Sequence, residues 1–457
     1  MEKAKNPENH AFLDKPNHTL IALSIPVLFS LVAEPITGLV DTAFIARLGA
    51  TPLAALGVGT VALSSTFWIF NFLGIGAQTE VAHSLGRKDS HGASKAASLA
   101  IVLSILFGGL MFLLGFPIST QIAQLLGAEG DVLANATQYI QVRLFAAPAV
   151  LITFTGFGVL RGMQDMRTPL WIATGINVLN IVLDYPLIFG FGAIPAMGVA
   201  GSALATVIAQ WLGTIWTLWA IGKRLGYTRD IHFAEAIKLI QIGGDLFIRT
   251  GSLVLFILYS TRVATQIGVE AGASHQAIRQ VWFFSTLVME AFAVTAQSLV
   301  GYFLGSEDVP TARRVSLYST VWSIGTGVVL AGAMLLSTDL VIAAFVPETA
   351  VPVFMGAWIV ASVSQPLSAV AFVTDGIHWG TGDYRYMRNG MVISTLIAAV
   401  MLYSINITAA NAFMMVWIAQ IVWIFVRSIF GVIRVWPGIG NAPIGNKRIK
   451  ALTLATE

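Results

Sequence analysis

Apolar stretches long enough to cross a lipid bilayer recur along the whole chain, and they restrict its possible folds more than any other feature. A hydrocarbon core of about 30 Å requires about 20 residues of helix. Twelve segments meet this requirement, with approximate spans 18–46, 54–82, 95–121, 132–161, 168–190, 197–222, 237–265, 273–303, 314–337, 350–379, 387–405 and 411–434. They lack the alternating pattern of barrel strands, so the sequence predicts an all-α polytopic membrane protein.

The composition agrees with this prediction. Hydrophobic residues make up 56% of the chain and charged residues 11%, compared with about 25% charged residues in soluble domains. The chain has no cysteine, which excludes disulfides and thiol catalysis. No basic domain accompanies the net charge of +3, and we therefore expect a lipid bilayer and no nucleic acid as partner.

The distribution of lysine and arginine predicts the orientation, because cytoplasmic loops retain these residues. They gather at the chain ends and in alternate loops: Lys3, Lys5, Lys15, Arg87, Lys88, Lys95, Arg161, Arg167, Lys223, Arg224, Arg229, Lys238, Arg313, Arg314, Arg385, Arg388, Arg427, Arg434, Lys447, Arg448 and Lys450. We therefore expect both termini in the cytoplasm and a multi-pass protein of the bacterial cytoplasmic (inner) membrane.

The chain also matches itself at an offset of about 219 positions, which indicates an internal duplication. Ala77-Gln78-Thr79 falls on Ala296-Gln297-Ser298, and Leu85-Gly86-x-x-Asp89 falls on Leu304-Gly305-x-x-Asp308. Six helices in each half would give both halves the same orientation in the membrane. This build is typical of a transporter.

The expected domains follow from this duplication. Residues 1–17 form a cytoplasmic segment, 18–222 a first lobe of six helices, and 223–236 a cytoplasmic linker. Residues 237–434 form the second lobe, and 435–457 a cytoplasmic tail.

Acidic residues inside these spans need a partner or a function, since a charge at the bilayer centre costs about 2.5–3.5 kcal/mol. They include Glu34, Asp41, Asp184, Asp245, Glu290 and Asp375. Asp245 lies one helical turn before Arg249, and we expect these two residues to form a structural ion pair.

Two of the expected helices in the first lobe each carry a stripe of polar residues. Glu34 and Asp41 are seven residues apart and share a helix face, while Asn177, Asn180 and Asp184 form a second stripe on the fifth span. If both stripes face the interior of the lobe, their oxygen atoms could surround a cation. Hydrogen bonds that only join helices are the alternative reading.

The candidate coupling site consists of Asp41, Asn180, Asp184 and Thr206. It could bind Na⁺ through oxygen atoms or a proton shared by its two carboxyl groups. The sequence leaves this choice open. Pro26 could kink the helix that carries Asp41 and act as a hinge.

Several motifs resemble the multidrug and toxic compound extrusion (MATE) family, especially its DNA-damage-inducible protein F branch. They are Glu34-Pro35-x-x-x-Leu39-Val40-Asp41-Thr42, Leu160-Arg161-Gly162-x-x-Asp165, Asn177-x-x-Asn180-Ile181-x-Leu183-Asp184 and Thr374-Asp375-Gly376-x-x-x-Gly380. The resemblance implies two six-helix lobes that export amphiphilic, often cationic compounds in exchange for Na⁺ or H⁺, without a cofactor. It also implies that Tyr139 joins the first-lobe site and that Asp375 and Glu290 are secondary coupling candidates.

A substrate cleft could be lined by Phe154, Phe157, Trp282 and Met289, and we expect a monomer that binds amphiphilic small molecules. A lipid-linked oligosaccharide flippase or an organic-anion exporter is the alternative, and it would use intramembrane arginines. These are Arg143, Arg249 and Arg279. An enzyme is not expected, because no histidine pair, nucleophile elbow or phosphate loop is present.

Overall fold

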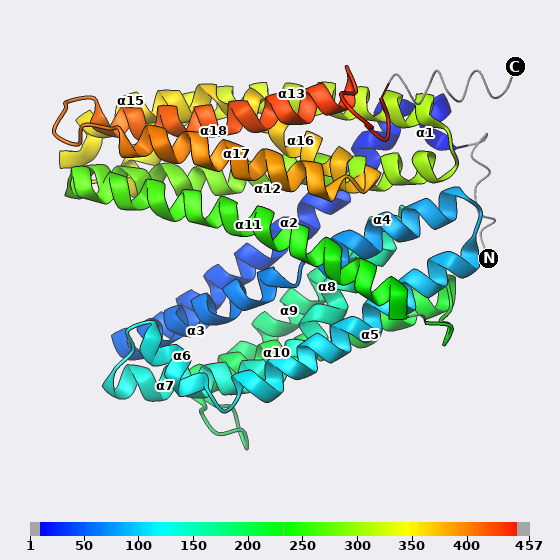
Figure 1. Cartoon of the computed structure of the whole chain (residues 1–457). Coiled ribbons are helices and arrows are strands. Elements are labelled where there is room, and N and C mark those ends of the chain that lie inside the picture. The colour runs from blue at the N-terminus through cyan, green and yellow to red at the C-terminus, as the bar shows by residue number, and fades with distance from the viewer. Residues whose placement is uncertain (1–9, 232, 446–457) are drawn as a thin grey trace, which may run out of the picture. The chain divides into compact units, whose positions relative to one another are not determined.

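The computed structural model describes residues 10–231 and 233–445, and over that range the chain is helical (Figure 1). The α-helices are α1 (Ala11–Asp14), α2 (Pro16–Ala46), α3 (Ala50–Ile69), α4 (Phe72–Gly86), α5 (Ser90–Gly115), α6 (Ser119–Leu125), α7 (Gly130–Leu144), α8 (Ala147–Gly162), α9 (Arg167–Phe189), α10 (Gly198–Arg224), α11 (Phe233–Ile267), α12 (Val269–Gly305), α13 (Val309–Leu336), α14 (Thr338–Phe345), α15 (Val351–Val363), α16 (Gln365–Thr381), α17 (Tyr384–Tyr403) and α18 (Ala412–Val435). A short 3₁₀ helix, Glu348–Ala350, precedes α15.

Ten helical spans in the described residues are long and apolar enough to cross a membrane, and α3 with α4 counts as one of them. The number rises to twelve if two bent pairs each count as one span. These pairs are α7 with α8, bent by 53°, and α15 with α16, bent by 47°. The predicted all-α polytopic fold is therefore confirmed, and the two expected spans 132–161 and 350–379 each contain a sharp break.

Contacts divide the described chain into two compact units. Unit 1 comprises Ile25–Gly243, and unit 2 comprises residues 10–24 and 244–445. The boundaries between the units thus fall inside α2 and α11, whereas the expected lobes begin at residues 18 and 237. Residues 1–9 and 446–457 of the expected terminal segments lie outside the described residues.

Specific contacts explain these boundaries. The start of α2 belongs to unit 2 because Ser24 Oγ donates a hydrogen bond to Thr295 Oγ1 (3.0 Å) and Trp322 Nε1 donates one to Asn17 Oδ1 (2.9 Å). The start of α11 belongs to unit 1, where the side chain of Leu239 is buried. Each of the two helices therefore begins in one unit and ends in the other.

The duplication seen in the sequence recurs in the structure. The unit boundaries follow Ser24 and Gly243, which are separated by the repeat offset of 219 residues. The same offset relates Asp89 and Asp308, whose side chains cap the N-termini of α5 and α13 by accepting a backbone N–H. The breaks between α7 and α8 and between α15 and α16 also coincide. The two halves thus share their helix ends and their bends.

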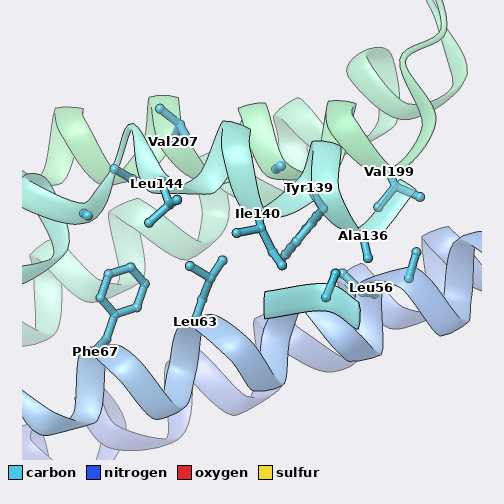
Figure 2. Packing of buried hydrophobic residues seen from close by; sticks show 14 of the residues in the cluster. Leu56, Leu63, Phe67, Ala136, Tyr139, Ile140, Leu144, Val199 and Val207 are labelled. Carbon is cyan, nitrogen blue, oxygen red and sulfur yellow. The ribbon is translucent and has the colours of Figure 1, made fainter. Parts of the chain in front are cut away.

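The core of unit 1 lies between α3, α7 and α10 (Figure 2). Tyr139 and Ile140 of α7 point toward Leu56 and Leu63 of α3. Trp358, the residue 219 positions after Tyr139, is fully buried in the corresponding cluster of unit 2. A bulky aromatic side chain therefore fills the same place in both repeats.

Small residues allow the helices to approach closely. In lipid the hydrophobic effect does not drive helices together, so their association depends on such close packing. A Cβ atom on Gly108 of α5 would overlap the backbone of Pro148 at the start of α8. In unit 2, a Cβ atom on Gly327 of α13 would lie 2.7 Å from Cα of Pro366 at the start of α16. Glycine is needed at both crossings.

Candidate functional site

Asp41, Asn180 and Asp184 meet inside unit 1. Asp41 lies on α2, and the other two residues lie one turn apart on α9. Asn180 Nδ2 donates hydrogen bonds to Asp41 Oδ1 (3.1 Å) and to Asp184 Oδ2 (2.7 Å). Asn180 and Asp184 are 1% and 0% exposed, which places a carboxyl group in full burial. The structure thus brings together three of the four residues expected to form the coupling site.

The amide of Asn180 holds the two carboxyl groups close enough to act on each other electrostatically. Two carboxylates can hydrogen-bond only if one of them carries a proton. Asn180 donates to both groups and therefore fixes their positions without adding charge. This arrangement can bind and release a proton.

The other unit 1 candidates form no hydrogen bond with this trio among the described residues. The hydroxyl of Thr206 on α10 donates to the backbone of its own helix (3.0 Å). Tyr139 is buried in the core between α7 and α3. Glu34 is exposed on α2, and Asn177 is half-buried on α9. Among the described residues, none of these four forms a hydrogen bond with the three central residues.

A bound Na⁺ fits these residues less well than a proton does. Hard cations require several converging oxygen ligands. Here the amide nitrogen of Asn180 faces both acids, and the proton of the Thr206 hydroxyl is directed to a backbone carbonyl.

Arg143 is a further charged residue of this site. It lies in the last turn of α7, close enough to act electrostatically on Glu34, Asp41 and Asp184. Its Nε atom is buried without a hydrogen-bond partner in the described part of the chain. The sequence suggested Arg143 only as a ligand for an anion, whereas the structure makes it a counter-charge to the acids.

The buried acid of unit 2 has a different environment. Asp375 on α16 accepts hydrogen bonds from Arg249 of α11 and from Arg427 of α18, the latter at 2.8 Å. The guanidinium of Arg427 also lies 4.6 Å from the ring centroid of Trp423. Glu290 of α12 acts electrostatically on Arg427. A carboxylate compensated by two guanidinium groups is better suited to an ion network than to binding a second cation.

The expected ion pair between Asp245 and Arg249 is wrong. Asp245 accepts a hydrogen bond from Arg388 Nη1 of α17 at 2.5 Å, and Arg249 pairs with Asp375. An exposed pair one turn apart stabilises a helix only weakly. Partners on α16 and α17 instead hold these two side chains within unit 2, where they join helices.

The apolar candidates are largely engaged in packing. Phe154 and Phe157 of α8 are half-buried against the cores of unit 1. Met289 is fully buried in α12, so its side chain lines no open surface of unit 2. Trp282 is half-buried, and its Nε1 atom has no hydrogen-bond partner among the described residues. Pro26 is buried in α2 just past the boundary between the units.

The sequence profile of the MatE family matches residues 26–186 and 251–404, which is more than half of the chain. The chain belongs to this family. The predicted resemblance to MATE transporters is thereby confirmed, and family and fold are those of transporters and not of enzymes.

Two curated relatives and one solved structure illustrate the match. Protein DETOXIFICATION 44, chloroplastic, of Arabidopsis thaliana is 28% identical over 97% of this chain and 90% of the relative. DNA damage-inducible protein F of Escherichia coli (strain K12) is 26% identical over 92% of each chain. A crystal structure of MATE in the bent conformation superposes with a TM-score of 0.84 at 22% identity, covering 96% of this chain and 97% of that one.

Arg427 of this MATE transporter lies within α18 and is 6% exposed, although the Lys and Arg distribution groups it with the basic residues of the cytoplasmic loops and chain ends. Its position eight residues before the end of an apolar span is the sequence feature that indicates a buried location. A charge at such a depth is expected to have a buried partner.

Proposed function

We propose that this MATE transporter is a secondary active antiporter that exports amphiphilic, mainly cationic organic compounds in exchange for inward-moving protons. The observation that carries the proposal is the pair of carboxyl groups, Asp41 and Asp184, bridged by Asn180 in the interior of unit 1. A proton or a substrate cation can neutralise this pair, but both cannot do so fully at the same time. Such competition is the basis of exchange.

The proposed cycle is alternating access of the two units. Proton binding at the pair changes the charge next to α2, and Pro26 supplies a point where that helix can bend because proline donates no backbone hydrogen bond. We place both termini in the cytoplasm and the protein in the bacterial cytoplasmic membrane as a monomer. The distribution of Lys and Arg supports the orientation.

Transport into proteoliposomes under separately imposed proton and Na⁺ gradients tests this proposal. We expect a proton gradient alone to drive transport of the cationic dye rhodamine 6G, and Asp41→Asn to abolish it. Asp339→Asn, which changes an exposed acid at the start of α14, is the matched control and should transport like the parent. Transport driven by Na⁺ alone, or full activity of Asp41→Asn, would contradict proton coupling at this site.

An organic-anion exporter or a lipid-linked oligosaccharide flippase remains the second candidate. Of the three arginines that favour it, Arg249 is compensated by Asp375 and Arg143 faces the acids of unit 1. Arg279 is different, because it has no acidic partner in the part of the chain that the structure describes.

A further inference from the structure

Unit 2 carries a basic group close to the position that corresponds to Asp41 of unit 1. The repeat offset of 219 residues puts Asp41 on Ser260 and Thr42 on Thr261. Thr261 of α11 is the centre of a small polar cluster. Its Oγ1 accepts a hydrogen bond from Arg279 Nη1 of α12 at 3.0 Å and lies 3.3 Å from His275 Nε2. Arg279 itself falls on Thr60 by the same offset, so the positive charge of unit 2 lies beside the position that corresponds to Asp41 and not at it.

The charge of Arg279 is uncompensated. Arginines 249, 388, 427 and 434 in unit 2 each pair with an aspartate. For Arg279, no carboxylate within the described ranges lies within ion-pair distance, and Thr261 supplies its hydrogen bond. The residue is half-buried within a spanning helix. An intramembrane arginine without an acid is costly to keep and therefore points to a ligand of opposite charge.

His275 adds a fixed polar group to the cluster. It is 2% exposed, and its ring centroid lies 5.5 Å from that of Trp417 and 6.3 Å from that of Phe413. Its Nδ1 atom is buried and has no hydrogen-bond partner among the described residues. Packing against two aromatic rings restrains the imidazole, so the hydrogen-bonding groups of the cluster are held in place before a ligand arrives.

We propose that Arg279, held in position by Thr261 next to His275, binds a carboxylate group of the transported compound. A guanidinium forms paired, charge-assisted hydrogen bonds with a carboxylate, and Arg279 donates only through Nη1 to Thr261. This inference rests on the proposed export function and narrows its substrate class. The favoured substrates are therefore organic cations that also carry a carboxylate.

Two dyes that differ in a single group test this assignment. Rhodamine 19 has a free carboxylate, and rhodamine 6G is its ethyl ester. Binding to the purified full-length protein is measured by fluorescence anisotropy without any gradient. We expect Arg279→Gln to weaken binding of rhodamine 19 by about tenfold or more, because a charge-assisted pair is lost. Binding of rhodamine 6G should change by less than about twofold.

Two further variants control for folding and for charge. Thr261→Val replaces the hydroxyl by a methyl group. It should weaken the binding of rhodamine 19 by about threefold and leave the binding of rhodamine 6G unchanged. Arg262→Gln removes an exposed positive charge from the neighbouring position and should affect neither dye. A melting temperature near that of the parent shows that a variant is folded. If Arg279→Gln does not fold, the comparison of the two dyes is made with Thr261→Val.

The inference is wrong if Arg279→Gln and Thr261→Val weaken the binding of both dyes equally, or if they weaken the binding of neither. It is also wrong if the parent binds neither dye. Failure of the proposed function has a different signature, since it appears as the absence of proton-driven rhodamine 6G transport by the parent. Selective loss of rhodamine 19 binding therefore supports the carboxylate site independently of the coupling ion.

Discussion

Replacement of Asp375 by asparagine tests whether the buried network of unit 2 is a structural element. The side chain of Asp375 is 11% exposed, and those of its partners Arg249 and Arg427 are 10% and 4% exposed. In Asp375→Asn the two guanidinium groups would remain buried without their counter-ion. Removal of one member of a buried ion pair typically costs about 3–5 kcal/mol.

The expected change in melting temperature follows from this cost. A domain of 150–250 residues loses about 2–4 °C for each kcal/mol, so unit 2 should melt about 6–20 °C below the parent. The assay is thermal unfolding of the purified protein in detergent, followed by tryptophan fluorescence. Asp339→Asn, at an exposed position, serves as the control and should melt like the parent.

A triple variant tests whether the loss of stability comes from the two uncompensated guanidinium groups. Combining Asp375→Asn with Arg249→Met and Arg427→Met removes the charges of Asp375 and of its two hydrogen-bonding partners, and buried ion pairs can be replaced by apolar side chains with little loss of stability. We expect this triple variant to regain most of the lost melting temperature. If Asp375→Asn melts within about 2 °C of the parent, the charge balance described for unit 2 is wrong. If it is stable but inactive in transport, Asp375 is a coupling residue.

Two further predictions concern packing and the end of the chain. Gly376→Ala should lower the melting temperature strongly, because the new methyl group would overlap the backbone of Ala293. Gly332→Ala, where the methyl group meets open space, should leave the melting temperature unchanged. Equal melting temperatures of the two variants would contradict the close helix crossing. Arg434→Met should speed proteinase K cleavage within residues 438–445, since Arg434 Nε donates to Asp383 (2.6 Å) and Nη1 to the carbonyl of Ile439 (2.5 Å). Arg314→Met, whose side chain only lies over the ring of Tyr318, should be cleaved at the parent rate, and unchanged cleavage of Arg434→Met would show that the arginine does not hold this segment.

The sequence predicted the features that depend on spacing along a single helix. The membrane spans follow from the length of apolar runs, and the grouping of Asn180 with Asp184 follows from their separation by one helical turn. The acid cluster itself also needed the family resemblance, because no spacing rule relates Asp41 to α9. Breaks such as the one between α7 and α8 escaped prediction, since the residues on both sides are apolar and helical.

Side-chain partners that lie far apart in the sequence could not be predicted in this way. Asp245 has a basic residue one turn away, yet it pairs with Arg388, which lies 143 residues later. The local pair is available to any isolated helix, but a buried charge gains more from a partner that also joins two helices. Arg427 illustrates the same limit, because its acid lies on another helix, 52 residues earlier.

The exchanged helix ends have a consequence for biosynthesis. Residues 10–24 leave the ribosome first but belong to unit 2, which is completed only when α18 has been made. Unit 1 in turn needs residues up to Gly243, which follow the segment that joins α10 to α11. Unit 1 is therefore incomplete until the start of α11 has been made, and the first segment of unit 2 has to await the whole second half of the chain. A chain divided after α10 would yield two fragments, each lacking a helical segment that the other carries.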